Sequence, residues 1–311
     1  MMKTLIFYLM SAILPLASWA TAPQQADPAF NTVVARPSYT SKHPKVLFDH
    51  AHMNAYTSSG VYQPFVDLIS HDGFQVTPGS VVFSKKSLKN WDVLIIANAR
   101  GPNAQSPAFT DEECDAVRDF VQSGKALLLL VDHSPFNTPS AGLAKLFGVE
   151  ISPGHAVDKV NYNKESQDQT EIVFSREGKN LVDHSITQGR DATERVNRFV
   201  TFSGTSLKGP ENSFMFLRFG EGAFEVVPPE PDPKPLAPDA APRDYKQIPA
   251  IGGGQGVALE FGKGRVVVIA EAAALTAQIG PGGYRYGMNS GNVENRQLAL
   301  NVMHWLSRLL N

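Results

Sequence analysis

The 311-residue sequence predicts an α/β protein: a mainly parallel sheet with helices on both faces and a C-terminal antiparallel hairpin extension. Short apolar runs alternate with helical patterns through the first half of the chain, as in strands joined by crossover helices. Some of these runs are apolar throughout, which is typical of parallel strands buried on both faces. Near the C-terminus, a short glycine-containing turn separates two strand-like runs, which indicates a hairpin.

The first half of the chain supplies the parallel strands. We expect strands at residues 45–49, 74–77, 91–97 and 126–131, and a short edge strand at 149–151. The run at 126–131 contains no polar residue, so both of its faces are expected to be buried.

Helical patterns lie between these strands. Apolar residues recur at helical spacing within residues 62–71. Thr110 and Glu113 have the spacing of a capping box, which predicts a helix that begins there and ends at Gly124. A further short helix is expected at 140–147.

The second half of the chain is less regular. Residues 152–220 are rich in polar residues with short strand-like pieces, and we expect them to extend the sheet. We expect a proline-rich loop at residues 228–249. Its first fifteen residues, 228–242, contain seven prolines and therefore cannot hold a strand ladder or a helix. The hairpin follows with strands at 256–261 and 265–270, and an apolar stripe from about residue 293 predicts a final helix docked on the sheet.

The opening residues predict export. Lys3 precedes an apolar run at 5–16, and small residues at 18–22 offer cleavage sites, which together indicate a signal peptide at residues 1–22. A membrane anchor is the alternative, but the run is shorter than the roughly 20 apolar residues that a spanning helix needs. We therefore expect a periplasmic or secreted protein with no stable membrane insertion after cleavage.

Beyond the signal peptide we expect one domain. A flexible segment at residues 23–43 leads into a single α/β domain at residues 44–311, because the remaining chain lies at the upper end of the size range of one domain. The formal net charge of −2 gives no electrostatic reason to expect nucleic acid as a partner. The composition leaves the oligomeric state open.

Cys114 is the single cysteine of the chain, so an internal disulfide is excluded. It lies within the helical pattern that follows Thr110, without the electropositive surroundings that activate a thiol. We therefore expect an unreactive thiol on a helix.

Polar side chains follow the predicted strands at their carboxyl ends, where open parallel sheets bind ligands. The catalytic candidates are Asp132, His133 and Glu271. The ligand-binding candidates are Asp49, His50, His52, Asn54, Asn98, Arg100, Ser134 and, from a glycine-rich loop near the C-terminus, Asn289. Such residues offer donors, acceptors and imidazole nitrogens to a small polar ligand or a metal ion. The prediction depends on Asp49, His52, Asp132 and Glu271 meeting at one rim of the sheet, since a single strand-end Asp more often caps a helix.

Three segments resemble a known family. They read Asp183-His-Ser-Ile-Thr-Gln-Gly189, Gly262-Lys-Gly-Arg-Val-Val-Val-Ile-Ala-Glu271 and Asn295-Arg-Gln-Leu-Ala-Leu-Asn-Val-Met-His-Trp-Leu306. With the order of strands and helices, the chain resembles the class I glutamine amidotransferase-like fold, which implies a flavodoxin-like sheet. It is more closely similar to exported bacterial proteins with a DUF4350-type domain, relatives of the domain in gliding-motility and intraflagellar-transport proteins. The resemblance covers about residues 45–310.

The resemblance implies amidotransferase chemistry only where a Cys stands on the turn after the fourth strand, because a thiolate attacks the amide carbon. In this chain that turn reads Val131-Asp132-His133-Ser134. The standard cysteine mechanism is therefore excluded, and the resemblance implies a member that lacks the catalytic Cys.

Three functions are compatible with these residues. The first is a non-catalytic domain that binds a small polar ligand, such as a saccharide. The second is a metal-dependent hydrolase that holds a divalent cation with strand-end His, Asp and Glu, although His50 and His52 point to opposite faces of an extended segment. The third is a serine hydrolase with Ser134 as nucleophile, although the glycines of a G-x-S-x-G turn are missing. The sequence identifies no cofactor, with a divalent metal as the alternative.

Overall fold

The computed structural model describes residues 24–102, 106–228, 245–250 and 253–311. The predicted signal peptide at 1–22 and most of the predicted proline-rich loop at 228–249 lie outside the described residues. The loop prediction is wrong for Lys246–Pro249, which form a strand because they follow the proline-rich part and pair with residues 224–227. Within these ranges, no helix combines the length and the apolar character that crossing a membrane requires.

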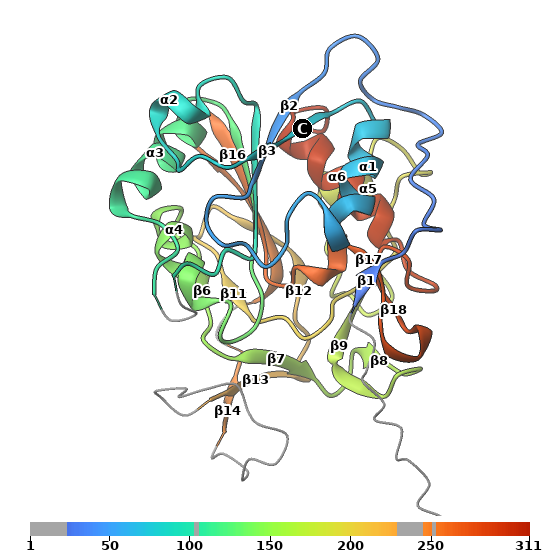
Figure 1. Cartoon of the computed structure of the whole chain (residues 1–311). Coiled ribbons are helices and arrows are strands. Elements are labelled where there is room, and N and C mark those ends of the chain that lie inside the picture. Colours follow the sequence, from blue (N-terminus) through green and yellow to red (C-terminus); the bar gives the residue numbers. More distant parts are fainter. Residues whose placement is uncertain (1–23, 103–105, 229–244, 251–252) are drawn as a thin grey trace, which may run out of the picture.

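A nine-stranded sheet runs through the centre of the molecule (Figure 1). Five neighbouring strands are parallel, in the order β3 (Gln75–Gly79), β2 (Lys45–Asp49), β4 (Val93–Ala97), β5 (Ala126–Leu130) and β16 (Gly264–Ile269). Numbered along the chain, this order is 2-1-3-4-5, which is that of flavodoxin-like folds. The predicted α/β fold is confirmed.

The remaining strands of this sheet are antiparallel. The predicted hairpin is present: β15 (Gly254–Phe261) pairs with β16 across the turn at Gly262, whose φ of 58° favours glycine. Beyond β15 lie β11 (Leu207–Lys208), β12 (Phe214–Arg218) and the edge strand β6 (Glu150–Ile151). β6 is outermost on its side, as expected for residues 149–151.

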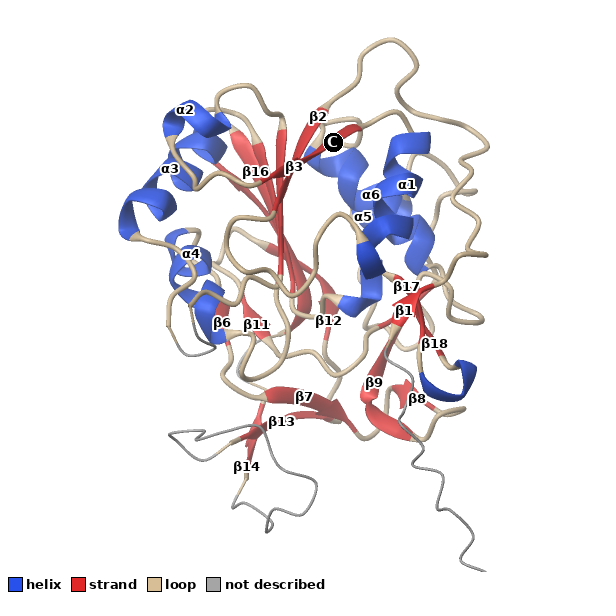
Figure 2. Cartoon of the chain, in the orientation of Figure 1, coloured by secondary structure: helices blue, strands red, loops and turns tan. Residues whose placement is uncertain are grey.

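Helices cover both faces of the sheet (Figure 2). One face carries α1 (Gln63–His71), α5 (Ser185–Gln188) and α6 (Asn295–Leu306), and the other α2 (Lys85–Leu88), α3 (Asp111–Gln122) and α4 (Ala141–Leu146). Short 3₁₀ helices lie at η1 (Gly60–Tyr62), η2 (Thr138–Ser140), η3 (Ala273–Leu275) and η4 (Pro281–Gly283).

The core is divided into two apolar layers by the sheet. Along β5, Leu128 and Leu130 pack in the layer beneath α1 and α6, whereas Leu127 and Leu129 pack in the layer beneath α3 and α4. Successive side chains therefore point to opposite faces, as the pleat of a strand requires. This alternation decides which strand-end residues can meet.

Helix α3 begins as the sequence predicts. Thr110 Oγ1 accepts a hydrogen bond from the Glu113 N–H at 3.3 Å, and Glu113 Oε2 accepts one from the Thr110 N–H at 3.0 Å. The reciprocal bonds satisfy two backbone donors at the start of the helix. They also leave the second carboxylate oxygen of Glu113 available to other partners.

Three small antiparallel sheets of the described chain lie below the central sheet in Figure 1, on the side of its carboxyl ends. They are β1 (Gln25–Ala26) with β17 (Ala277–Ile279) and β18 (Arg285–Gly287); β8 (Tyr162–Asn163), β9 (Asp168–Ser175) and β10 (Arg198–Val200); and β7 (His155–Asp158), β13 (Ala223–Val227) and β14 (Lys246–Pro249). Residues 152–220 were expected to extend the central sheet, but only β11 and β12 do so. The other strands of this region belong to separate sheets: β8, β9 and β10 pair with one another, and β7 pairs with β13.

Residues 24–43, expected to be flexible, follow the face that carries α1 and α6. β1 pairs with β17, and Phe30, Val34 and Tyr39 contact the apolar layer of that face. The Ser38 N–H donates to Asp72 Oδ1 at 2.9 Å. These are the contacts of a docked segment, and its flexibility in solution remains a prediction to be tested.

Candidate functional site

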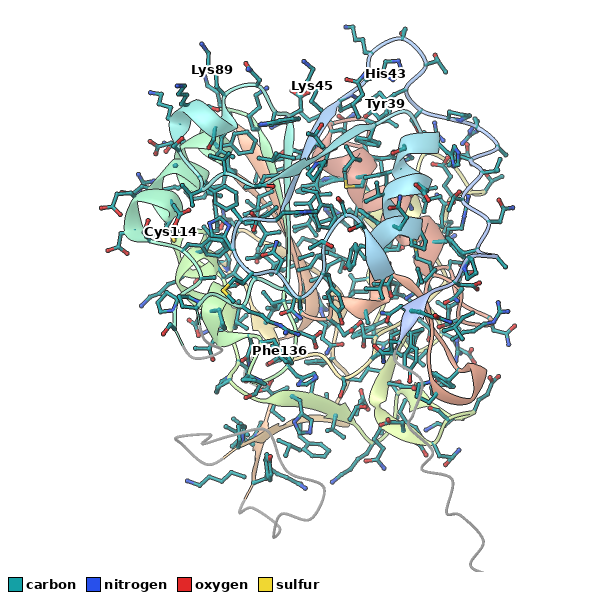
Figure 3. All side chains as sticks on the ribbon, viewed as in Figure 1. Tyr39, His43, Lys45, Lys89, Cys114 and Phe136 are labelled. Carbon is teal, nitrogen blue, oxygen red and sulfur yellow. The ribbon has the colours of Figure 1, made fainter. Side chains whose placement is uncertain are left out.

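Asp132 and Glu271 follow the neighbouring parallel strands β5 and β16 at their carboxyl ends. Leu130 pairs with Ile269 in the last register position, and each acidic residue lies two positions further on. Side chains two positions apart face the same side of a strand. In Figure 3, Lys45 marks the amino-end rim of the sheet, and Phe136, which follows β5, lies toward the carboxyl-end rim. The two carboxyl groups therefore share one rim and one face.

Both side chains line a cavity of about 260 Å³. Its described lining residues are Gln24, Tyr56, Asp132, His133, Asp168, Thr170, Glu171, Phe202, Ser203, Glu271, Ala273 and Tyr286. They come from the central rim, from β9, from the loop after β10, from β18 and from the start of the N-terminal segment. None of these lining residues is Lys or Arg, so the cavity is acidic and partly aromatic.

The two carboxyl groups are electrostatically coupled. Burial raises the pKa of Asp132 to about 6, against the opposing effects of His133 and Arg100. Burial, and after it the charge of Asp132, hold the pKa of Glu271 well above its ordinary range. Burial and the two nearby carboxyl groups also raise the pKa of the Tyr56 hydroxyl. Burial and mutual repulsion therefore favour the protonated form of both carboxyl groups.

The carboxyl oxygens of the pair are only partly satisfied. Asp132 Oδ1 accepts a hydrogen bond from the His133 N–H at 2.8 Å, and Glu271 Oε1 accepts one from the Ala273 N–H at 2.8 Å. Two further backbone N–H groups lie near Glu271 and favour its charged form. In the described structure, however, Glu271 Oε2 has no partner in bonding geometry. A buried polar atom without a partner destabilises the empty site and can bind a ligand hydroxyl.

Other predicted residues surround the pair. Asn98, which has a positive φ of 57°, directs its Nδ2 toward Asp132 Oδ2 at 3.5 Å. His133 Nδ1 donates to the backbone oxygen of the next residue at 2.7 Å, and its Nε2 lies 3.8 Å from Asp132 Oδ1. The Arg100 guanidinium lies 4.7 Å from the centre of the Phe136 ring. The structure thus brings together Asn98, Arg100, Asp132, His133 and Glu271.

Asp49 and His52 belong to a different, buried network with Glu113. His52 Nδ1 lies 2.9 Å from both carboxylate oxygens of Asp49, and His52 Nε2 lies 2.7 Å from Glu113 Oε1. Burial acts to lower the pKa of His52, but the hydrogen bonds and charges of the two carboxylates outweigh it, so the pKa is raised. Asn54 Nδ2 donates to Asp49 Oδ2 at 2.9 Å. Because both ring nitrogens are engaged, we assign this network a structural role in joining the loop after β2 to α3.

The pleat of β2 explains why the two groups of side chains are separate. Along β2, Val46 and Phe48 pack beneath α1 and α6, whereas Leu47 packs beneath α3. Asp49 is two positions after Leu47 and faces α3. The expectation that Asp49 and His52 share a pocket with Asp132 and Glu271 is therefore corrected: they occupy the same rim but opposite faces of the sheet.

Two further predicted residues, His50 and Ser134, form hydrogen bonds with other parts of the chain. His50 Nε2 accepts a hydrogen bond from the Ser58 N–H at 2.9 Å, and burial lowers the pKa of His50. The Ser134 N–H lies 3.4 Å from the backbone oxygen of Gly154, and the His133 ring contacts the Ser134 backbone, not its hydroxyl.

Asn289 was expected to point into the cleft, but it is not among the described residues that line the cavity. Its Nδ2 donates to Asp27 Oδ2 at 3.0 Å and to the backbone oxygen of Gln278 at 3.1 Å. It therefore joins the N-terminal segment to β17.

Several cavity residues were not predicted. Glu171 is the most connected: its Oε2 accepts hydrogen bonds from Tyr284 Oη at 2.6 Å and Ser166 Oγ at 2.7 Å. Tyr56 and Tyr286 had a sequence signal, since they lie in a strand-end segment and in the glycine-rich loop already singled out. Glu171 carried no such signal, because the placement of β9 over the rim depends on tertiary packing.

Metal and thiol chemistry have little support from the described side chains. Within the described ranges, no group of three or more His, Cys, Asp or Glu residues is placed to hold a metal ion. Cys114 is buried in α3 (Figure 3), in the apolar layer beneath that helix, and burial raises the pKa of its thiol to about 11. The predicted position of the thiol on a helix is confirmed.

Comparison with known proteins adds a likeness of fold. No protein-family model matches the sequence, and no curated protein sequence matches it. The mmIFT52 N-terminal domain is 17% identical, with a TM-score of 0.59, over 85% of this chain and 97% of that one. A ThuA-like protein from Bacteroides uniformis is 14% identical over 87% and 94% of the two chains, with a TM-score of 0.40. A GMP synthase-like protein from Thermoplasma acidophilum is 9% identical over 87% and 97%, with a TM-score of 0.44. Of these three, the first shows a shared fold, and none of them shows an activity for this chain.

Proposed function

We propose that the protein binds a small polyhydroxylated ligand, such as a monosaccharide, in the cavity at the carboxyl ends of β5 and β16. The observation that carries the proposal is the buried, partly unsatisfied pair of Asp132 and Glu271 inside an acidic and aromatic cavity. We also propose, from the N-terminal sequence, that the protein acts after export. A DUF4350-type protein without the catalytic Cys is compatible with this function.

The polar lining suits a ligand that donates hydrogen bonds. Asp132, Asp168, Glu171 and Glu271 offer acceptor oxygens, and no Lys or Arg belongs to the described lining. Adjacent hydroxyl groups on a sugar ring supply several donors at once. Glu271 Oε2 would gain a partner when such a ligand binds.

The size and the aromatic residues of the cavity suit a single ring. Its volume of about 260 Å³ is below the roughly 300–1,000 Å³ of cavities that hold drug-sized ligands. Tyr56, Phe202 and Tyr286 offer apolar surface against which the C–H groups of a sugar ring can pack. The cavity therefore fits one monosaccharide unit, or one end of a longer chain.

Isothermal titration calorimetry with a panel of hexoses tests the proposal. At least one hexose should bind, and Glu271→Leu should weaken that binding about tenfold, since it removes one ligand hydrogen bond to a buried polar group. Glu271→Gln keeps the hydrogen-bonding capacity and should retain most of the affinity. Glu177→Gln, at an exposed position, is the matched control. Absence of hexose binding, or equal affinity in the Glu271→Leu protein, would refute the proposal.

A hydrolase is the second candidate function, favoured by the raised pKa values of the same pair. A carboxyl group with a pKa of about 6 can donate a proton near neutral pH, as a general acid does. Of the metal-ligand candidates, Asp132, His133 and Glu271 line one cavity, although no three described His, Cys, Asp or Glu residues are placed to hold a metal ion. His50 and His52 are engaged elsewhere. Chromogenic glycosides and esters test this candidate, with and without added divalent cations. Turnover lost in Asp132→Asn would support it, and turnover lost only in Ser134→Ala would favour the serine mechanism.

A further inference from the structure

A second cavity, of about 310 Å³, lies beside the proposed ligand cavity. Its polar walls come from the β8–β9 connection, from β10 and from the loops around β18. The residues that matter here are Asn163, Ser166, Arg198, Tyr284, Arg285 and Ser290. None of them was a site candidate from the sequence.

The two cavities share one apolar floor. Val173, Val200 and Phe202 form a small cluster apart from the main core, and Tyr284 and Tyr286 pack against it. Phe202 lines both cavities. Its ring centre lies 5.4 Å from that of Tyr286, which lies 4.8 Å from that of Tyr284. The rings of Phe202, Tyr284 and Tyr286 therefore form an aromatic ridge between the two cavities, which lie next to each other.

A hydrogen-bonded wall also joins the cavities. Glu171 lines the first cavity, and its Oε2 accepts hydrogen bonds from Tyr284, Ser166 and, at 2.9 Å, Asn163 Nδ2, all of which line the second. A substituent on a ligand ring in the first cavity can thus extend into the second cavity. This wall holds both cavities in a defined relative position.

The charges of the two cavities differ. Arg198 and Arg285 line the second cavity, and no cationic residue is found in the described lining of the first. Within the described part of the chain, the Arg198 guanidinium has no hydrogen-bond or ion-pair partner. The Arg285 guanidinium is exposed and lies 3.7 Å from Asp27 Oδ2. Glu165 is the acidic residue of this lining.

We propose that the second cavity is a subsite for an anionic group, a carboxylate or phosphate, carried by the same ligand whose hydroxyl groups occupy the first cavity. This inference rests on the proposed function and narrows it to acidic saccharides. Guanidinium groups suit such anions because their planar donor geometry matches carboxylate and phosphate oxygens. The Asn163 amide, which has a second N–H besides the one it donates to Glu171, adds a further donor.

Calorimetry with matched pairs of sugars tests the inference: D-glucose with D-glucuronate, D-galactose with D-galacturonate, and D-mannose with D-mannose 6-phosphate. In at least one pair, the acidic sugar should bind about tenfold tighter than the uncharged sugar at low salt. Adding 0.5 M NaCl should reduce this difference, because the Debye screening length falls from about 10 Å at 0.1 M salt to about 3 Å at 1 M. The double variant Arg198→Gln, Arg285→Gln should remove this advantage and leave the affinity for the uncharged sugar unchanged. Arg195→Gln, at an exposed position outside the cavity, should have no effect.

The outcomes separate this inference from the proposed function. If uncharged sugars bind and acidic ones bind no tighter, or if the double variant changes nothing, the anionic subsite is refuted and the proposed function stands. If the acidic advantage depends on the two arginines but Glu271→Leu has no effect, the arginines bind the anion without the first cavity, and both the proposed function and a ligand that spans the two cavities are refuted. If no sugar of any pair binds, both are refuted.

Discussion

At the level of single residues, His52 illustrates how a candidate ligand-binding side chain becomes a structural one. Its ring lies between the carboxylates of Asp49 and Glu113, with the residue only 5% exposed. A histidine so placed stabilises the fold most when it carries a positive charge between two negative ones. The raised pKa of His52 has this cause, acting against burial.

We predict that His52→Ala lowers the free energy of unfolding by about 3–5 kcal/mol, because it leaves two buried carboxylates without their common partner. A histidine with a raised folded-state pKa contributes stability that is complete below its ordinary pKa of 6.5 and is lost as pH rises through the raised value. The loss in the variant should therefore be larger at pH 6 than at pH 9. Urea denaturation at the two pH values measures it.

His50→Ala is the matched control for this experiment. His50 is an acceptor for the Ser58 N–H and has no carboxylate bonded to its ring in the described structure. We expect a loss of about 1 kcal/mol from one hydrogen bond. Equal losses for both variants, independent of pH, would contradict the structural role of His52.

Asp132 gives a second prediction at this scale. Its folded-state pKa of about 6 exceeds its ordinary 3.8, so the folded state binds the proton more tightly than the unfolded state does. Stability should therefore fall as pH rises from about 4 to above 6, by up to about 3 kcal/mol for a shift of this size. Asp132→Asn should remove this part of the pH dependence, because an amide oxygen can still accept the His133 N–H without ionising. Thermal or urea denaturation between pH 4 and 8 measures it.

The test compares the stability of the Asp132→Asn variant with that of the wild type at each pH. Near pH 4 the variant and the wild type should have similar stability, and the variant should become the more stable protein above pH 6. Other carboxyl groups, such as Glu194 with a pKa of about 2, act in both proteins alike. Parallel stability curves would show that Asp132 ionises normally in the folded protein.

At the level of elements, Asn295 and Asn301 of the last helix form hydrogen bonds with the backbone of neighbouring segments. Asn295 is fully buried and completes the open edge of β10: its Oδ1 accepts from the Val200 N–H at 3.0 Å, and its Nδ2 donates to the Val200 oxygen at 2.8 Å. Asn301 Nδ2 donates to the backbone oxygens of Ile186 and Glu194, both at 2.9 Å. Both asparagines belong to the segment Asn295–Leu306, one of the three that resemble the known family. Their hydrogen bonds join α6 to the chain around it.

We predict that Asn295→Ala lowers the free energy of unfolding by about 3 kcal/mol, because it leaves buried backbone groups of Val200 and Ala274 without partners. β10 carries Arg198 and Val200 of the second cavity and leads into Phe202, which lines both cavities, so sugar affinity should fall as well. Chemical denaturation and calorimetry measure the two effects. Gln297→Ala, which removes one bond at a half-buried site of the same helix, should cost below about 1 kcal/mol; a similar loss in both variants would argue against this function of Asn295.

At the level of the whole molecule, the candidate site lies where independent sheets meet. The central sheet supplies Asp132 and Glu271, the β8–β10 sheet supplies Glu171, and β18 supplies Tyr286. The N-terminal segment adds Gln24 and is paired to this assembly through β1 and β17. The cavity therefore depends on the docking of chain segments that are far apart in the sequence.

We predict that a protein beginning at Pro44 is less stable than one beginning at Gln24 by at least about 3 kcal/mol. The shorter protein loses the packing of Phe30, Val34 and Tyr39, and fully burying such side chains contributes roughly 1.5–3 kcal/mol each. Urea denaturation of the two proteins measures the difference. Equal stability would instead support the flexible segment expected from the sequence.

Part of the candidate site was accessible from the sequence. Asp132, His133 and Glu271 were identified because apolar strands end just before them, and the structure places all three in one cavity. Asp49 and His52 were identified by the same signal. The position of a strand end in the sequence, however, does not determine the face of the sheet to which a side chain points. Glu171 and Phe202 had no comparable signal, since they lie on or next to strands outside the central sheet.

The sequence by itself determined the main local elements of the central sheet and its mainly parallel character. Apolar runs, a capping box and a glycine turn are short-range properties, and their physical causes act within a few residues. Only the tertiary structure decided which polar residues share a cavity, because this depends on the pleat of each strand and on where β8–β10 and residues 24–43 dock. These placements result from long-range burial of apolar side chains, which no local pattern specifies.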